Sequence, residues 1–257
     1  MNTKPQSFQI LTRALNEIRE KGFVPCTRPN NKDGGIGNTL EDLLEVVENN
    51  RQECDYLDYE IKSQRELSSS AITLFSMASK HIEDAKIRNN RRLFENYSRQ
   101  DMEDNVKRLY WTIIYNRESL LYENYKCSLR FDDELNPTKL FLVIIDMRNN
   151  YIDNLTYWDL NVIRNKISGK MKNLLACTAI EKNINGVRYF NYNSFECYFD
   201  FNFNNFINAI KDGVIQVDFR IGADLTGNNA GKYHDHGTGF RIQRRNLKDL
   251  YETYESI

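Results

Sequence analysis

Apolar residues recur along this chain with two different spacings, and their alternation limits the folds that it can adopt. Helical spacing predicts an amphipathic helix over residues 7 to 21, with apolar positions at Phe8, Leu11, Leu15 and Ile18. Alternation from Asp55 to Ser63 predicts a half-buried strand, and a further helix is predicted near Asp159 to Lys172. Other strand-like runs cover residues 71–76, 109–114, 140–146, 174–181, 187–192 and 215–221. The mixture predicts an α/β fold.

A loop and a second helix are predicted between the first helix and the first strand. The segment Pro25 to Gly37 is rich in proline, glycine and asparagine, which favours a loop. Thr39 followed by Asp42 resembles a capping box, so we expect the second helix to begin there. That start would place Glu41 in the first helical turn.

The composition is that of a soluble globular protein. Hydrophobic residues make up 40% of the chain, but the longest apolar run, Leu140 to Ile145, is far shorter than the roughly 20 residues of a membrane span. The five cysteines are odd in number and form no CxxC pair, so we expect reduced thiols rather than disulfides or a zinc knuckle. No linker-like stretch is visible. We therefore expect one cytoplasmic domain over residues 1–257 that does not associate with a membrane.

Charge is unevenly distributed, although the formal net charge is only −1. Residues 41–60 hold eight acids and one base, whereas residues 232–248 hold five bases and one acid. Residues 86–108 hold seven bases and four acids. An acidic patch with separate basic segments suits a polyanion bound beside a divalent cation, although solvated helix faces also produce such clusters.

Asp55, Glu60 and Lys62 have the chemistry of a metal-dependent phosphodiesterase. Such cleavage needs carboxylates that bind Mg²⁺ and a cation that orients the attacking water. Glu60 and Lys62 are two apart on the predicted strand, so their side chains project to the same side. Asp55 would lie about 17 Å from Glu60 in an extended chain, so a shared metal requires a turn or bulge between Asp55 and Asp58. The pattern D-x4-E-x-K alone also arises by chance.

Longer stretches of the chain are also distinctive, and these are IGNTLEDLL at 36–44, DYLDYEIKS at 55–63, AITLF at 71–75, YW at 157–158, YNS at 192–194, VDFRIG at 217–222 and HDHGTGFRI at 234–242. In this order they resemble the MvaI/BcnI group of restriction endonucleases and, more distantly, the mismatch-repair nicking enzyme MutH. The resemblance covers nearly the whole chain, although residues 80–135 match poorly. Cys54 stands where the family motif has a proline, which supplies no ligand.

The resemblance implies a PD-(D/E)xK nuclease core, with a mixed central sheet flanked by helices and two lobes that form a DNA-binding cleft. The approximate lobes are residues 1–135 for catalysis and 136–257 for DNA recognition. The family's triplet matches Asp55 and Glu60, which would bind Mg²⁺, and Lys62, which would orient or activate the water. Glu41 matches an acidic residue of the preceding helix.

The last third of the chain holds residue types that read G·C base pairs. Arginine binds guanine O6 and N7, aspartate accepts from cytosine N4, and histidine can donate to a guanine edge. The resemblance places this region in the recognition lobe, and we expect Arg244 and Arg245 to meet phosphates. The two histidines of the HDH stretch could instead hold a transition metal, or lie on a loop without function. The expected recognition residues are Asp218, Arg220, His234, Asp235, His236 and Arg241.

The predicted function is a type II restriction endonuclease that cuts double-stranded DNA at a C·G-rich site of the 5′-CCNGG type, such as CCWGG or CCSGG. The resemblance implies 5′-phosphate ends, a monomer and a cognate DNA methyltransferase in the same system. The first alternative is a MutH-like repair nickase with the same chemistry. The second is a DNA-binding protein without cleavage activity, whose acidic cluster is structural.

Overall fold

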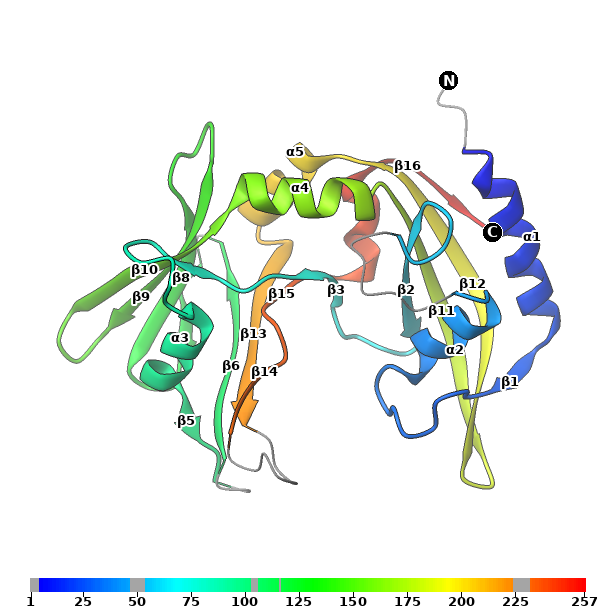
Figure 1. The fold of residues 1–257 in the computed structure, drawn as a ribbon, viewed down its shortest axis with the longest axis horizontal. Helices are drawn as coiled ribbons and strands as arrows, with labels where there is room; N and C mark the ends of the chain where they lie inside the picture. Colours follow the sequence, from blue (N-terminus) through cyan, green and yellow to red (C-terminus); the bar gives the residue numbers. More distant parts are fainter. Residues whose placement is uncertain (1–4, 47–53, 103–105, 116, 224–231) are drawn as a thin grey trace. The chain divides into compact units, whose positions relative to one another are not determined.

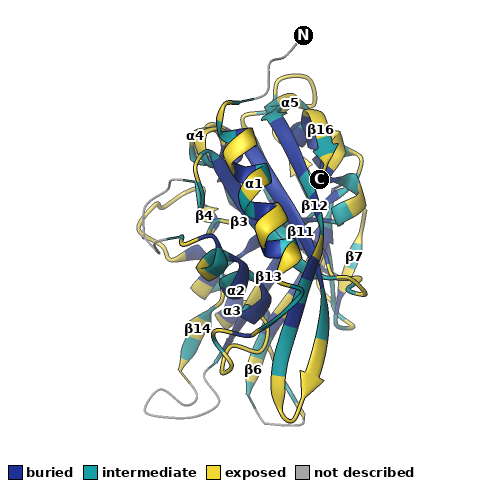
Figure 2. Cartoon of the chain, turned by 90° about the vertical axis from the view of Figure 1, so that its right-hand side faces the viewer, coloured by how far each residue is buried: buried dark blue, intermediate teal, exposed yellow. Residues whose placement is uncertain are grey.

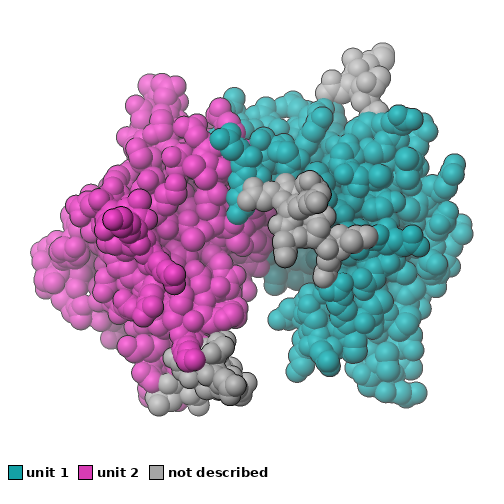
Figure 3. Space-filling view, viewed as in Figure 1, with its two compact units in different colours: residues 1–72, 165–205, 245–257 teal, residues 73–164, 206–244 magenta. Residues whose placement is uncertain are grey.

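The computed structural model describes residues 5–46, 54–102, 106–115, 117–223 and 232–257. The chain forms two compact units (Figure 3), which are unit 1 with residues 1–72, 165–205 and 245–257, and unit 2 with residues 73–164 and 206–244. Each unit joins segments that lie far apart in the sequence. The units therefore differ from the expected lobes, which were two continuous segments that met near residue 135.

Unit 1 is built on a mixed five-stranded sheet (Figure 1). Its strands pair in the order β1-β12-β11-β2, and β16 also pairs with β12. β2 and β11 are parallel, whereas β11 and β12 form a long antiparallel hairpin. The strands are β1 (Phe23–Pro25), β2 (Tyr59–Arg65), β11 (Asn173–Ile184), β12 (Val187–Phe201) and β16 (Tyr251–Ser256).

Helix α1 (Ser7–Glu20) covers the hairpin and confirms the helix predicted over residues 7–21. Its fully buried residues Leu11 and Leu15 pack into one hydrophobic core with Phe190 and Tyr192 of β12. Figure 2 shows the exposed outer side of α1 in front of the buried parts of β11 and β12. The apolar stripe of the helix therefore supplies one wall of the core, as its periodicity predicts.

Helix α2 (Gly35–Leu43) begins before Thr39. The predicted capping box, with Thr39 at the start of the helix, is therefore wrong. Thr39 lies inside the helix, where its Oγ1 donates to Gly35 O at 2.7 Å. Asp42 Oδ2 accepts a hydrogen bond from Thr27 Oγ1 at 2.5 Å, so this side chain binds the preceding loop instead of a helix start. Glu41 therefore lies in the last turn of α2 and not in the first.

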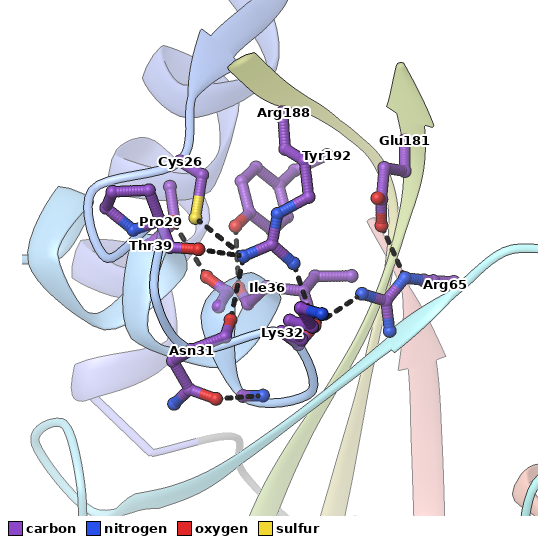
Figure 4. Close-up of polar contacts among 12 residues, drawn as sticks. Cys26, Pro29, Asn31, Lys32, Ile36, Thr39, Arg65, Glu181, Arg188 and Tyr192 are labelled. Atoms are coloured by element: carbon purple, nitrogen blue, oxygen red, sulfur yellow. Dashed lines mark hydrogen bonds and ion pairs between the residues drawn. The ribbon is translucent and has the colours of Figure 1, made fainter. Parts of the chain in front are cut away.

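Arg188 of β12 fixes the loop that leads into α2 (Figure 4). Its guanidinium donates to the carbonyl oxygens of Pro29 at 3.0 Å, Asn31 at 2.8 Å and Lys32 at 2.7 Å. Because α2 packs against β2, this anchor helps to set the helix beside the strand that carries Glu60.

The described residues of unit 2 form two sheets. One has the strand order β4-β10-β9-β8-β7, and the other has the order β3-β15-β13-β6-β5 with β14 paired to β13. The first sheet consists of β4 (Lys80–His81), β7 (Ser119–Leu121), β8 (Tyr125–Phe131), β9 (Lys139–Asp146) and β10 (Tyr151–Asp159). The second consists of β3 (Ile72–Ser76), β5 (Arg99–Gln100), β6 (Lys107–Ile114), β13 (Ile215–Ala223), β14 (Tyr233–Asp235) and β15 (Gly239–Ile242).

Buried aromatic side chains cover one face of the second sheet. Trp158 lies 5.9 Å from Phe219 and 5.7 Å from Phe240, measured between ring centroids, and Phe240 also stacks on Phe75 at 4.6 Å. On β13 and β15 the residues next to Phe219 and Phe240 project to the opposite face, and this polar face holds Asp218, Arg220 and Arg241. The remaining helical segments are α3 (Asn89–Tyr97), α4 (Leu160–Lys170), α5 (Phe203–Lys211) and the 3-10 helix η1 (Arg244–Leu250).

The cysteines are all free thiols, as predicted, and each is buried except Cys54, which is half-buried. In the described part of the chain, no helix has the length and apolar character needed to cross a membrane.

Candidate active site

A tight turn brings Asp55 back to the strand that carries Glu60. Tyr56 N donates to Tyr59 O at 3.1 Å, and Tyr59 N donates to Tyr56 O at 2.8 Å. Leu57, inside the turn, adopts a left-handed backbone with a φ of 53°. The predicted turn is confirmed. The predicted strand is too long at its start, because β2 begins only at Tyr59 and Leu57 is exposed.

Asn173, the first residue of β11, secures this turn. Its Nδ2 donates to Asp58 Oδ2 at 2.9 Å and to Asp58 O at 3.3 Å. On the other side of the turn, Asp55 Oδ2 accepts a hydrogen bond from Ile61 N at 2.9 Å. One oxygen of Asp55 is therefore bound to the backbone of β2, which places this carboxylate beside the strand.

Glu60 and Lys62 project to the same side of β2, as their spacing predicts. Lys62 Nζ lies 2.6 Å from Glu60 Oε1, and Glu60 is only 2% exposed. Burial raises the pKa of the Glu60 carboxyl above its ordinary value, the Lys62 ammonium opposes this effect, and the Asp55 carboxylate adds to it.

A second lysine, which the sequence analysis missed, reaches the same carboxylates. Lys170 is the last residue of α4, and its Nζ lies 3.2 Å from Glu60 Oε2 and 3.8 Å from Asp55 Oδ1. Burial works against its charged form, but the Glu60 and Asp55 carboxylates outweigh this effect and raise the pKa of Lys170. No motif marks this residue, because its role depends on where α4 ends beside β2.

The two carboxylates fit a hard divalent cation. Asp55 Oδ1 and Glu60 Oε2 both lie close to one cation, the Lys170 ammonium, and Glu60 Oε2 is buried without a hydrogen bond of good geometry. Carboxylate oxygens are the ligands that Mg²⁺ prefers. Within the described residues, no three His, Cys, Asp or Glu side chains form one metal-binding group, so Glu41 does not join Asp55 and Glu60 in such a group.

Asp218 and Arg220 share a face of β13, as predicted, but Asp218 is buried there. The carboxylate is 5% exposed, and its Oδ1 accepts from Thr112 Oγ1 at 2.6 Å. Its Oδ2 accepts from Arg220 Nε at 2.8 Å and Arg241 Nη1 at 2.7 Å. Burial works against the charge, yet these partners hold the pKa of Asp218 below its usual value. Both carboxylate oxygens of Asp218 therefore have partners within the protein, and one of these oxygens binds two arginines.

His234 and His236 are exposed, with ring centroids 4.3 Å apart. Asp235 between them accepts a hydrogen bond from the buried side chain of Asn90 at 2.8 Å. His236 N donates to Arg220 O at 3.1 Å, which ties this loop to β13. No group of three His, Cys, Asp or Glu ligands forms anywhere in the described ranges, so the transition-metal alternative has no complete site there.

The family follows from comparison with known proteins. Residues 12–251 match the model of the MvaI/BcnI restriction endonuclease family. The chain belongs to this family. The chain is therefore a site-specific endonuclease of the restriction type, with the PD-(D/E)xK-type fold that the sequence predicts.

Two solved structures of MvaI resemble this endonuclease along its whole length. The MvaI complex with its cognate DNA substrate is 30% identical, with a TM-score of 0.85 and 99% of each chain covered. MvaI in the absence of DNA is 31% identical, with a TM-score of 0.59 and 100% of each chain covered. The search of curated proteins gave no match.

This MvaI/BcnI family member carries its predicted site residues in two groups. The catalytic residues lie in unit 1, whereas the recognition residues from Asp218 to Arg241 lie in unit 2. Arg244 and Arg245 both belong to η1, but Arg244 falls in unit 2 and Arg245 in unit 1. Tyr110, which is exposed on β6, lies directly opposite Arg220 in the sheet.

Proposed function

We propose that this endonuclease hydrolyses double-stranded DNA at a C·G-rich site of the 5′-CCNGG type, such as CCWGG or CCSGG. The reaction would depend on Mg²⁺ and leave 5′-phosphate ends. The observation that carries the proposal is the convergence of Asp55, Glu60 and Lys62 in one partly buried site. The similarity to MvaI bound to its cognate DNA supports a duplex substrate.

In the proposed reaction Asp55 and Glu60 hold the metal ion. Mg²⁺, when bound, supplies a polarised water and neutralises charge on the phosphate. Glu60 Oε1 fixes the Lys62 ammonium at 2.6 Å. Lys62 then orients the water for in-line displacement of the 3′ oxygen and offsets the negative charge that develops on the phosphate. Glu41 remains a predicted member of the site.

Base recognition is assigned to the polar face of the second sheet of unit 2. Arg220 is exposed there and would bind guanine through O6 and N7, with His234 and His236 as further donors. Arg241 would act beside Arg220, since both are held by one carboxylate. Asp235, bound by Asn90, would shape the histidine loop.

Positioning on the duplex is assigned to Arg244 and Arg245, which would contact phosphates. We further propose that the protein acts as a monomer in the cytoplasm and is accompanied by a cognate DNA methyltransferase. These assignments rest on the family and on the chemistry of the residues.

Plasmid digestion tests the proposal. Purified protein is incubated with plasmids that contain or lack CCWGG and CCSGG sites, with Mg²⁺ or with EDTA. We expect linear product only from site-containing plasmid with Mg²⁺, and ends that a ligase can rejoin without added kinase. Lys62→Ala should abolish cutting, whereas Lys172→Ala, at an exposed lysine outside the site, should cut normally. Survival of every plasmid would refute the assignment, and nicked circles without linear product would favour a MutH-like nickase.

A further inference from the structure

The Lys170 ammonium and the Lys62 ammonium contact different oxygens of the acidic pair. Lys62 Nζ lies beside Glu60 Oε1, whereas Lys170 Nζ lies beside Glu60 Oε2 and Asp55 Oδ1. The remaining oxygen, Asp55 Oδ2, accepts a hydrogen bond from Ile61 N. The pair of oxygens left for a metal ion is therefore the pair that Lys170 faces.

A divalent cation and an ammonium cannot share these two oxygens without strong repulsion. Like charges at about 4 Å repel each other even where solvent screens them, and more strongly where the site is partly buried. Glu60 is 2% exposed, so its charge is poorly screened by water. Without a counter-charge, two carboxylates this close together would disfavour each other's ionised form.

We infer that Lys170 is a placeholder cation that neutralises Asp55 and Glu60 in the metal-free enzyme and leaves them when a divalent ion binds. This inference rests on the proposed metal site. It makes Lys170 a competitor of the metal, in contrast to Lys62, whose contact with Glu60 Oε1 can persist. Binding of the metal is then coupled to a movement of one side chain.

The position of Lys170 suits such a movement. It is the last residue of α4, and its side chain is 32% exposed, so the flexible stem can swing towards solvent. The carbonyl groups at the end of α4 give the displaced ammonium a favourable environment, because the C-terminus of a helix carries partial negative charge. The backbone itself is held, since Cys54 Sγ lies 3.5 Å from Gly169 O and 3.6 Å from Lys170 O.

Metal binding without DNA tests the inference directly. Lys170→Met and Lys172→Met remove the same charge two residues apart, but Lys172 is exposed and outside the site. Titration calorimetry with Ca²⁺ should show that Lys170→Met binds the ion at least about fivefold more tightly than the wild type, and that Lys172→Met is unchanged. In EDTA, Lys170→Met should melt at a lower temperature than the wild type and gain more stability from Ca²⁺. Equal or weaker Ca²⁺ binding by Lys170→Met would overturn the inference that Lys170 is a placeholder cation.

A measurement on the wild type guards against misfolding of the variant. Reductive methylation followed by mass spectrometry should show that Lys170 reacts several-fold faster with Ca²⁺ than with EDTA, while Lys172 reacts at the same rate in both. An unchanged rate at Lys170, in protein that binds Ca²⁺, overturns the inference and leaves the proposed function intact. Absence of Ca²⁺ and Mg²⁺ binding by wild type and variant alike removes the metal site itself, and the inference with it.

Discussion

Arg220 Nε lies 2.8 Å from the buried Oδ2 of Asp218, and this contact fixes an exposed guanidinium on the polar face of β13. Arg241 approaches the same oxygen at 2.7 Å from β15. A long side chain held in place before binding loses less conformational entropy when it meets a partner. Arg220 is thus the residue proposed to contact the base, and Asp218 is the residue that positions Arg220.

Arg220→Ala should weaken cutting at the target site by about 1 to 3 kcal/mol in kcat/KM, the range for a bidentate guanine contact. Calcium binding should not change, because Arg220 lies in unit 2 and the acidic pair lies in unit 1. Cleavage kinetics on a duplex with one site, together with calorimetry, provide the measurement. Equal cutting by the variant would remove Arg220 from the recognition set.

Asp218→Asn should also weaken cutting, although Asp218 is not proposed to touch DNA. The amide offers one acceptor oxygen in place of two charged ones, so Arg220 loses its fixed position. We expect the effects of Asp218→Asn and Arg220→Ala to be non-additive in a double-mutant cycle, because the first acts through the second. Full additivity of the two losses would contradict the positioning role.

Asp153→Asn should lower the free energy of unfolding at pH 7 by about 3 kcal/mol, because it removes one partner of a buried ion pair. Asp153 is 1% exposed and accepts hydrogen bonds at 2.7 Å from both Arg92 and Tyr97. Burial opposes its charge, but Arg92 and Tyr97 hold the pKa of Asp153 below the ordinary value. Denaturant titration at pH 7 provides the measurement.

The Asp153 carboxyl also predicts that the stability of the fold depends on pH. A group whose pKa is lower in the folded than in the unfolded state adds stability at pH values above its unfolded-state pKa. This stability is lost as the pH falls towards its folded-state pKa. Stability should therefore decline below about pH 4. The decline should be shallower in Asp153→Asn than in the wild type and unaltered in Asp212→Asn, at an exposed aspartate. If stability falls with pH in the same way in all three proteins, the contribution of Asp153 is disproved.

Leu57→Asn should preserve cutting and raise the melting temperature slightly. Leu57→Val should reduce both the cutting activity and the melting temperature. Leu57 has a φ of 53°, a conformation that asparagine tolerates and that β-branched residues disfavour. Its side chain is 49% exposed, so the change removes little packing. Thermal melts and plasmid digestion of both variants provide the test. A valine variant as active and stable as the wild type would show that this turn does not limit the placement of Asp55.

Local patterns predicted a large part of this fold. The apolar stripe of α1 and the strand-like runs of β3, β6, β9 and β13 are found at nearly the predicted positions, because periodicity reports directly which face is buried. Helix α3, strand β8 and strand β10 were not predicted, since charged and polar residues interrupt their apolar patterns. The start of α2 was misplaced because Thr39 and Asp42 have partners inside the helix and in the preceding loop.

The sequence by itself determined the chemistry of Asp55, Glu60 and Lys62, the need for a turn after Asp55, and the family. Residues two apart on a strand project to the same side, and this rule depends on no other part of the chain. Only the tertiary structure brought Lys170 to the two carboxylates and buried Asp218 among its partners. Both results depend on contacts between segments far apart in sequence, and no local spacing records which distant side chain will balance a buried charge.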